Sequence, residues 1–341
     1  MATIGASYLN LIDAYRAGGD AATAQVVEAL RRSSPAVKDA ITVPANKGAS
    51  HMHAIRTGLP AVTWGRLYQG IPQSKSGRTM VEDTTGFVEG LSTVDTRLLE
   101  IADNPALLRD SEGQSFMESL TQEGETGIFY HDSASTPEKF KGLAARYNVI
   151  GGGGAGNQIV DGGGAGSDNT SIWMVTWGEN ATHLIHPKGT QAGIIRQDKG
   201  EQRVLDSDGN AYYVKEELFR WHLGLAVRDW RLNVRIANLD VSDLIAGTVD
   251  VLKFLRQGYH KLAGRIRATD MKDENASLNG RTVIYMNRTV YEALDAQMTS
   301  PSLNAALRLT PMQLEGDEVE AYRNIPIRVT DALLNTEAAV A

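Results

Sequence analysis

The 341-residue sequence contains no cysteine. This absence excludes disulfide bonds, thiolate metal sites and cysteine nucleophiles, and it suits a protein that matures in a reducing cytoplasm. No apolar run approaches the roughly 20 residues that a membrane span needs, and the N-terminal segment lacks the basic and apolar regions of a signal peptide. A net charge of −7 gives no overall attraction for nucleic acid. We therefore expect a soluble cytoplasmic protein that is not a DNA- or RNA-binding module.

Catalytic motifs are also missing. The sequence has no G-x-S-x-G elbow, no H-E-x-x-H and no G-x-x-x-x-G-K-[ST]. Its charged groups are most simply interpreted as solvated side chains; the groups in question are Glu216-Glu217, Asp317-Glu318 and the basic set Arg228, Arg231 and Arg235. We predict no catalytic residues and no cofactor.

The glycine-rich stretch at 151–166, GGGGAGNQIVDGGGAG, satisfies the pattern G-x-G-x-x-G. A dinucleotide-binding site needs a helix directly after such a pattern, because the helix N-terminus holds the pyrophosphate. Here only six residues separate the two glycine clusters, too few for a stable helix. We favour a flexible loop with left-handed backbone positions. A nucleotide-binding enzyme that uses this segment remains the alternative.

Histidines recur at short spacing, as His51 with His53 and His183 with His186. An H-x-H pair can ligate a metal when further ligands arrive from elsewhere in the fold. Nothing in the sequence marks such partners, so we predict exposed or core histidines and no metal site.

The N-terminal quarter contains two segments that cannot be stable alone. Residues 1–57 carry two short helical patterns and read as an arm, and residues 58–92 read as a long β-hairpin. In the hairpin, PAVTWGRLYQGI forms one strand, PQSKSG the turn and RTMVEDTTGFVEGLS the second strand. Short helices and a two-stranded ribbon bury too little surface to fold independently. Both segments therefore need a partner.

The rest of the chain mixes helices and strands. Asn104 before Pro105 is a helix start signal and predicts a long helix over 104–130, preceded by a helical DTRLLEIADN. A turn of helix and a short strand are expected in 136–150, one helix capped by Ser242 or Asp243 after residue 241, and a helix at 288–299. Strands are predicted in SIWMVTW, THLIHP, AYYVKEELFRWHLGLAVRDW, LNVRIANLDV, RTVIYM and IPIRVTDAL.

Long strings along the whole chain resemble the major capsid proteins of tailed bacteriophages, which have the fold named after the phage Hong Kong 97. The resemblance is carried by IRTGLPAVTWGRLYQGIPQSKS, TGIFYHDSASTPEKFKGLAARYN, IVDGGGAGSDNTSIWMVTWGENATHLIHPKGTQAG, GLAVRDWRLNVRIANLDVSDL and NIPIRVTDALLNTEA.

The resemblance implies an α+β architecture. Its parts are an N-terminal arm, an extended two-stranded loop, a long spine helix in a peripheral domain, and an axial domain of a sheet flanked by helices. On this sequence they are expected at 1–57 for the arm, 58–92 for the extended loop, 93–240 for the peripheral domain with its spine helix at about 104–130 and a strand-rich elaboration, 241–320 for the axial domain, and 321–341 for a C-terminal strand that returns to the peripheral domain.

The resemblance also implies a function. We expect a structural protein that assembles with itself into hexamers and pentamers of an icosahedral head, in the cytoplasm of a bacterial host, around double-stranded DNA that it does not bind sequence-specifically. A separate scaffolding protein and a portal are expected partners, and a decoration protein is an option; a membrane is not expected. The side chains expected to contact the next subunit are Trp64, Arg66, Leu67, Tyr68, Lys75 and Arg78. A cellular compartment shell of the encapsulin kind is a further alternative.

Overall fold

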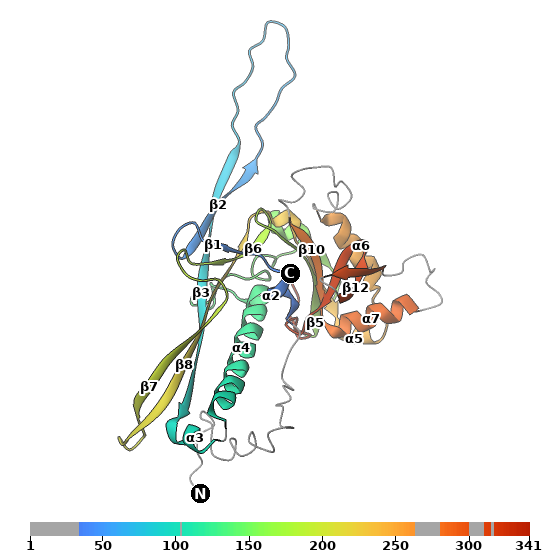
Figure 1. Cartoon of the computed structure of the whole chain (residues 1–341). Helices are drawn as coiled ribbons and strands as arrows, with labels where there is room; N and C mark the ends of the chain where they lie inside the picture. The colour runs from blue at the N-terminus through green and yellow to red at the C-terminus, as the bar shows by residue number, and fades with distance from the viewer. Residues whose placement is uncertain (1–33, 103, 263–279, 300–309, 315–316) are drawn as a thin grey trace.

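A computed structural model describes residues 34–102, 104–262, 280–299, 310–314 and 317–341. Its strands form a continuous sheet in the order β11-β12-β13-β10-β5-β6-β8-β3-β2. Off this path, β1 pairs with β6, β4 with β9, β7 with β8, and β9 with β5. Figure 1 shows a ribbon that projects from one end and a long helix beside the sheet, with α5 (Val241–Ile245), α6 (Val251–Lys261) and α7 (Arg288–Thr299) on the opposite side.

The elements follow one another along the chain with these bounds: α2 Pro35–Asp39, β1 Thr42–Pro44, β2 Ser50–Gly58, β3 Gly77–Asp95, α3 Thr96–Ile101, α4 Pro105–Tyr130, the 3₁₀ helix η1 Gly154–Gln158, β4 Ile159–Asp161, β5 Asn169–Trp177, β6 Thr182–His186, β7 Ile194–Leu205, β8 Ala211–Val227, η2 Trp230–Leu232, β9 Val234–Asp240, α5 Val241–Ile245, α6 Val251–Lys261, β10 Arg281–Met286, α7 Arg288–Thr299, β11 Thr310–Leu314, β12 Asp317–Tyr322 and β13 Ile325–Val329. The helical patterns predicted before residue 34 lie outside the described residues.

Helix α4 begins where the sequence predicts it. The Asn104 side chain accepts a hydrogen bond from Leu107 N at 3.1 Å, and Pro105 occupies the first turn, where a missing N–H costs nothing. The helix lies along β3 and β8, with Phe116 stacked on Phe219 at a ring-centroid distance of 5.4 Å. The long helix predicted over 104–130 is confirmed, and α3 confirms the shorter helical prediction before it.

The centre of the sheet is buried on both faces. Along β5, Trp173, Val175 and Trp177 point into one apolar cluster with α4, and Ile172 and Met174 into a second cluster with α6 and α7. Alternation by two residues explains this division, and burial of both faces explains why the strand is a continuous apolar run. The predicted strands that correspond to β5, β6, β8, β9, β10 and β13 are confirmed.

The ribbon differs from its prediction. Its strands are β2 and β3, which pair antiparallel from Ser50 with Thr84 to Gly58 with Gly77. The predicted strand at 60–71 is wrong, because residues 59–76 form the irregular loop at the tip. The alternation of apolar residues there has no opposing strand to pair with. The outgoing strand comes instead from residues that the sequence pattern placed in the arm.

Three other predictions are wrong. Residues 136–150 form turns without a helix or strand, although Leu143 and Tyr147 are fully buried there. The single helix predicted after residue 241 is two helices, α5 and α6, because Gly247 takes a φ of 74° between them. Each has an aspartate N-cap, Asp240 for α5 and Asp250 for α6, in place of the predicted cap. Strands β7, β11 and β12 are absent from the sequence prediction.

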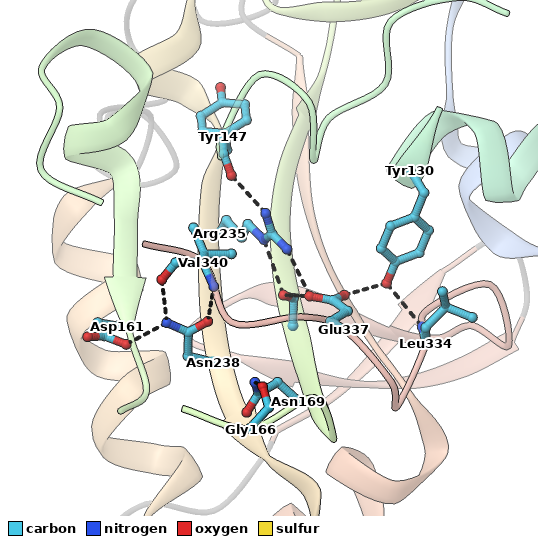
Figure 2. Close-up of polar contacts among 11 residues, drawn as sticks. Tyr130, Tyr147, Asp161, Gly166, Asn169, Arg235, Asn238, Leu334, Glu337 and Val340 are labelled. Carbon is cyan, nitrogen blue, oxygen red and sulfur yellow. Dashed lines mark hydrogen bonds and ion pairs between the residues drawn. The ribbon is translucent and has the colours of Figure 1, made fainter. Parts of the chain in front are cut away.

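The last strand, β13, pairs with β10 and β12. The residues that follow it reach α4 and β9. Glu337 accepts a hydrogen bond from Tyr130 of α4, and it forms an ion pair with Arg235 of β9 at 2.8 Å. Val340 exchanges two backbone hydrogen bonds with the Asn238 side chain, at 2.8 and 3.0 Å (Figure 2).

Candidate functional site

The tip of the ribbon, residues 59–76, carries most of the side chains expected to contact a neighbour. Trp64 and Leu67 are 98% and 91% exposed, and Tyr68 is fully exposed. Leu59, Val62 and Ile71 in the same loop are also exposed. Large apolar side chains gathered at one place on a surface mark an interaction site. The described part of the chain leaves these side chains exposed, as a surface that packs against another molecule would be.

Few bonds fix the backbone of the tip. Ser74 Oγ donates to Ala61 O at 2.7 Å, and Gln69 N donates to Arg66 O at 3.3 Å in the turn at Leu67 and Tyr68. Tyr68 itself has a φ of 66°, in the left-handed region that non-glycine residues rarely adopt. The loop is held mainly at its base, so its shape can adapt to the surface that covers it.

The tip is positively charged as well as apolar. Arg66, Lys75 and Arg78 are exposed on the ribbon, and no aspartate or glutamate occurs between Ala54 and Val81. The whole chain has the opposite sign, with a net charge of −7. The structure therefore brings all six predicted contact residues to one end of the ribbon. Their chemistry fits a partner surface that is apolar at its centre and acidic at its rim.

Exposed apolar and acidic side chains also lie at the other end of the molecule, where Asp110 already pairs with Arg196 at 2.8 Å. Ile101 of α3 and Leu107 of α4 are 61% and 63% exposed, and Glu100 and Asp110 beside them in sequence are exposed too. We call these four residues the α3–α4 elbow. Figure 1 places α3 at the end of the molecule opposite the ribbon tip. The tip therefore cannot cover the elbow of its own chain.

The glycine-rich stretch at 151–166 packs closely on β9. Its first glycine cluster runs into η1, a 3₁₀ helix of five residues, where a phosphate site needs a longer helix, and β4 follows before the second cluster. Gly151, Gly153 and Gly154 have φ values of 71°, 79° and 53°, which confirms the predicted left-handed positions. At Gly164 a Cβ would lie 2.2 Å from the Asn169 side-chain oxygen, so only glycine allows this approach.

A hollow of about 630 Å³ lies beside this loop, with Asp161, Arg256 and His260 among the side chains that line it. Lys261, on its edge, donates hydrogen bonds to the carbonyl oxygens of Asn157 and Ile159, at 3.0 and 2.7 Å. Lys261 therefore links α6 to η1 and β4. The hollow is open to solvent.

Several charged side chains that the sequence placed in solvent are buried. Glu217 is 7% exposed and forms ion pairs with Arg109 and with Arg196, the latter at 2.9 Å. Arg235 is 4% exposed, pairs with Glu337, and lies over the ring of Trp173 at 5.1 Å. The interpretation of these two as solvated is wrong, because their partners come from distant segments. Figure 2 shows Arg235 between the last residues of the chain and Tyr147.

A family model described as major capsid protein GP7 matches residues 18–341. The chain belongs to this family of major capsid proteins. Among solved structures, a chain of bacteriophage epsilon15 is 29% identical, with 100% of this chain and 99% of that chain covered and a TM-score of 0.75. A capsid chain of bacteriophage JBD30 is 11% identical, with 97% and 96% covered and a TM-score of 0.49. Comparison with curated proteins gives no match.

An encapsulin of Synechococcus elongatus PCC 7942 is 11% identical, with 68% of this chain and 96% of that chain covered and a TM-score of 0.44. Family membership and the epsilon15 match confirm the predicted Hong Kong 97-like fold. Proteins of this family are structural subunits of the icosahedral shell of tailed bacteriophages and not enzymes. The nucleotide-binding enzyme and the cellular compartment shell are less well supported.

Within the described ranges, no helix is long and apolar enough to cross a membrane. The same part of the chain contains no group of three or more histidine, aspartate or glutamate side chains arranged to hold a metal ion. His51, His53 and His183 do come together, from strands that the sequence could not place side by side.

Proposed function

We propose that subunits of this capsid protein are joined through the ribbon tip, which packs on the α3–α4 elbow of a neighbouring copy. The exposed apolar tip carries the proposal, since Trp64, Leu67 and Tyr68 are almost completely exposed in the described part of the chain. Burying an aromatic or aliphatic side chain of this size contributes about 1.5–3 kcal/mol. Three such side chains supply a useful fraction of an association energy, and each contact recurs at every copy of a closed shell.

The charged residues of the tip would guide this contact. Arg66, Lys75 and Arg78 belong to the ribbon, while Glu100 and Asp110 belong to the elbow. Opposite charges on two exposed surfaces speed association and set register more than they add affinity, and salt screens them. We therefore expect assembly to slow as ionic strength rises, without a matching loss in the stability of finished shells.

The finer features of the head belong to the same proposal. Hexamers and pentamers would enclose double-stranded DNA, and a separate scaffolding protein, a portal and, as an option, a decoration protein would assemble with them in the cytoplasm of the host. The net charge of −7 supports a shell that holds DNA without binding it tightly, because each added phosphate contact would raise affinity. The division of the chain into arm, extended loop, peripheral and axial domains is also part of this proposal.

The test is a tip variant in which Trp64, Leu67 and Tyr68 are all changed to serine. Because these side chains are exposed in the subunit, the unfolding midpoint in urea should equal that of the wild type. Shells should disappear from electron micrographs, and the protein should sediment as free subunits or capsomers. In the matched control, Leu205 and Tyr213 are changed to serine. These two side chains are 55% and 51% exposed on the β7–β8 hairpin. A tip variant that assembles as the control does would refute the proposed contact.

A further inference from the structure

Three buried histidines meet where the ribbon leaves the body of the protein. His51 and His53 of β2 are 8% and 6% exposed, and His183 of β6 is fully buried. The ring of His51 lies edge-on to His183 at 5.3 Å between centroids and 6.2 Å from His53. This histidine cluster therefore joins the first ribbon strand to β6, which pairs with β8 in the body.

The cluster contains more polar atoms than protein partners. His53 Nε2 contacts Val227 O at 3.1 Å, but its Nδ1 has no hydrogen-bond partner, and neither has Nδ1 of His51. Neither ring nitrogen of His183 has a hydrogen bond of normal geometry, although the Gly178 backbone lies close enough to act on the ring. Buried polar groups are normally paired, and an unpaired one costs about 1–3 kcal/mol. An arrangement with four such nitrogen atoms in one place needs a reason beyond packing.

Few negative charges face the cluster. Asp83 of β3 is 4% exposed, and its Oδ2 lies 3.8 Å from His53 Nδ1, but its Oδ1 already pairs with Arg146 at 2.7 Å. Arg228, after β8, adds a second positive charge and is bound to the Glu179 carbonyl oxygen at 3.2 Å. Protons that enter the cluster would thus meet one aspartate and two arginines, so the charge of a protonated cluster would be poorly balanced.

The pKa values agree with the geometry. Burial, with the nearby His51 and Arg228, lowers the pKa of His183 to about 4, although a backbone contact with Gly178 opposes the shift. Burial also lowers the pKa of His51 and of His53, and Asp83 opposes the shift in both. The folded state therefore favours neutral rings. An opened state, in which water reaches the rings, binds protons near the ordinary pKa of about 6.5.

We propose that the histidine cluster is an acid-sensitive joint, which holds the ribbon to β6 when its rings are neutral and releases the ribbon when they take up protons. The sign follows from linkage: a lowered pKa gives stability that is present above about pH 6.5 and lost as the pH falls toward 4. His183 alone raises the equilibrium constant for opening on the order of 50-fold between about pH 7 and about pH 4.5. The other two rings add to this change.

The cluster does not depend on assembly, so the free full-length chain can be tested. Hydrogen–deuterium exchange, corrected for the intrinsic pH dependence of exchange, would be measured at about pH 7 and about pH 4.5. Amides of β2 and β6 should lose protection in acid. Those of β10, which pairs with β5 and β13 in the same sheet, should keep theirs. Wild-type protein that retains protection in β2 and β6 at the lower pH would overturn the proposal.

Single substitutions show which histidine rings take up the protons that release the ribbon. His183→Gln and His51→Gln keep a polar side chain that does not titrate, and each should reduce the acid-induced loss of protection by several-fold. His222→Gln, on β8 and outside the cluster, is the matched control and should behave as the wild type. If His183→Gln does not fold, His51→Gln and the wild-type profile decide the question. Equal acid sensitivity in His51→Gln and the control would contradict the assignment.

Discussion

Gly124 should be the most restrictive position in α4. It lies in the C-terminal half of the helix and is buried against Trp221 of β8. A methyl group added there would lie 2.2 Å from Cζ3 of Trp221, with two more ring atoms at 2.8 and 3.0 Å. Trp221 is itself only 5% exposed, so its ring has little room to move. Gly124→Ala must therefore push the helix away from the sheet.

Two effects of opposite sign decide the magnitude. Alanine favours a helix over glycine by about 1 kcal/mol, which would stabilise the variant. Overpacking a closed interface costs about 1–3 kcal/mol, and a contact as short as 2.2 Å belongs at the upper end of that range or beyond it. The net expectation for Gly124→Ala is a loss of about 2 kcal/mol in the free energy of unfolding.

Gly113 provides a matched comparison in the same helix. A methyl group there would lie 3.2 Å from Cζ of Phe219 and 3.3 Å from Cζ of Arg196, distances that a flexible arginine can relieve. Gly113→Ala should therefore change stability by less than about 1 kcal/mol in either direction. Urea unfolding followed by tryptophan fluorescence and by helical circular dichroism would measure both variants. A Gly124→Ala protein as stable as Gly113→Ala would refute the packing argument.

Three further predictions concern buried polar groups. Burial raises the pKa of Glu125 from 4.5 to about 7, so the wild type should lose up to about 3 kcal/mol as the pH rises through 7; Glu125→Gln should remove that slope from urea midpoints between about pH 5 and about pH 9. Arg235→Met should cost about 3–5 kcal/mol because it leaves Glu337 buried without its cation, and adding Glu337→Gln should recover part of the loss in a double-mutant cycle. Tyr285→Phe should cost about 1–3 kcal/mol in thermal unfolding, since Tyr285 accepts from Trp177 and donates to a buried aspartate. A wild-type urea midpoint that does not change with pH would contradict the first expectation, and additive stability losses in the double-mutant cycle would contradict the second. A Tyr285→Phe protein with unchanged stability would contradict the third.

The pH dependences of Glu125 and the histidine cluster have opposite signs. The folded-state pKa of Glu125 is raised, so its contribution is fully present below about pH 4.5 and is lost as the pH rises through 7. The folded-state pKa of His183 is lowered, so its contribution is present above about 6.5 and is lost in acid. Glu125 accepts from Ala36 N at 2.9 Å and from Thr330 Oγ1 at 3.1 Å, far from the ribbon. The two effects can therefore be measured in separate segments.

Local signals in the sequence predicted much of the fold. Asn104 and Pro105 mark the start of α4 because capping depends only on adjacent residues. The apolar run at β5 predicted a buried strand because both of its faces are covered. At the tip, apolar alternation was misread as a strand, since an assembly surface and a strand can share that pattern. The resemblance nevertheless placed Trp64 and its neighbours at a contact, and the structure shows them exposed together.

What the sequence could not supply were contacts between distant segments. Arg235 lies 102 residues before Glu337, so no local pattern links them. Glu217 meets Arg109 from a helix 108 residues earlier, and the same glutamate was interpreted as solvated. No local pattern shows that Gly124 packs closely against Trp221, which lies far later in the sequence. Each of these depends on a partner that only the folded chain identifies.

Cover of the ribbon tip by another copy of the chain can be measured directly. Because the sequence has no cysteine, Leu67→Cys introduces a single thiol at a position that is 91% exposed in the subunit. Its rate of reaction with a maleimide would be compared between free subunits and assembled shells. We expect rapid labelling of the free protein. Labelling in shells should be at least about tenfold slower, because the thiol is buried there. Equal rates in the two states would contradict it.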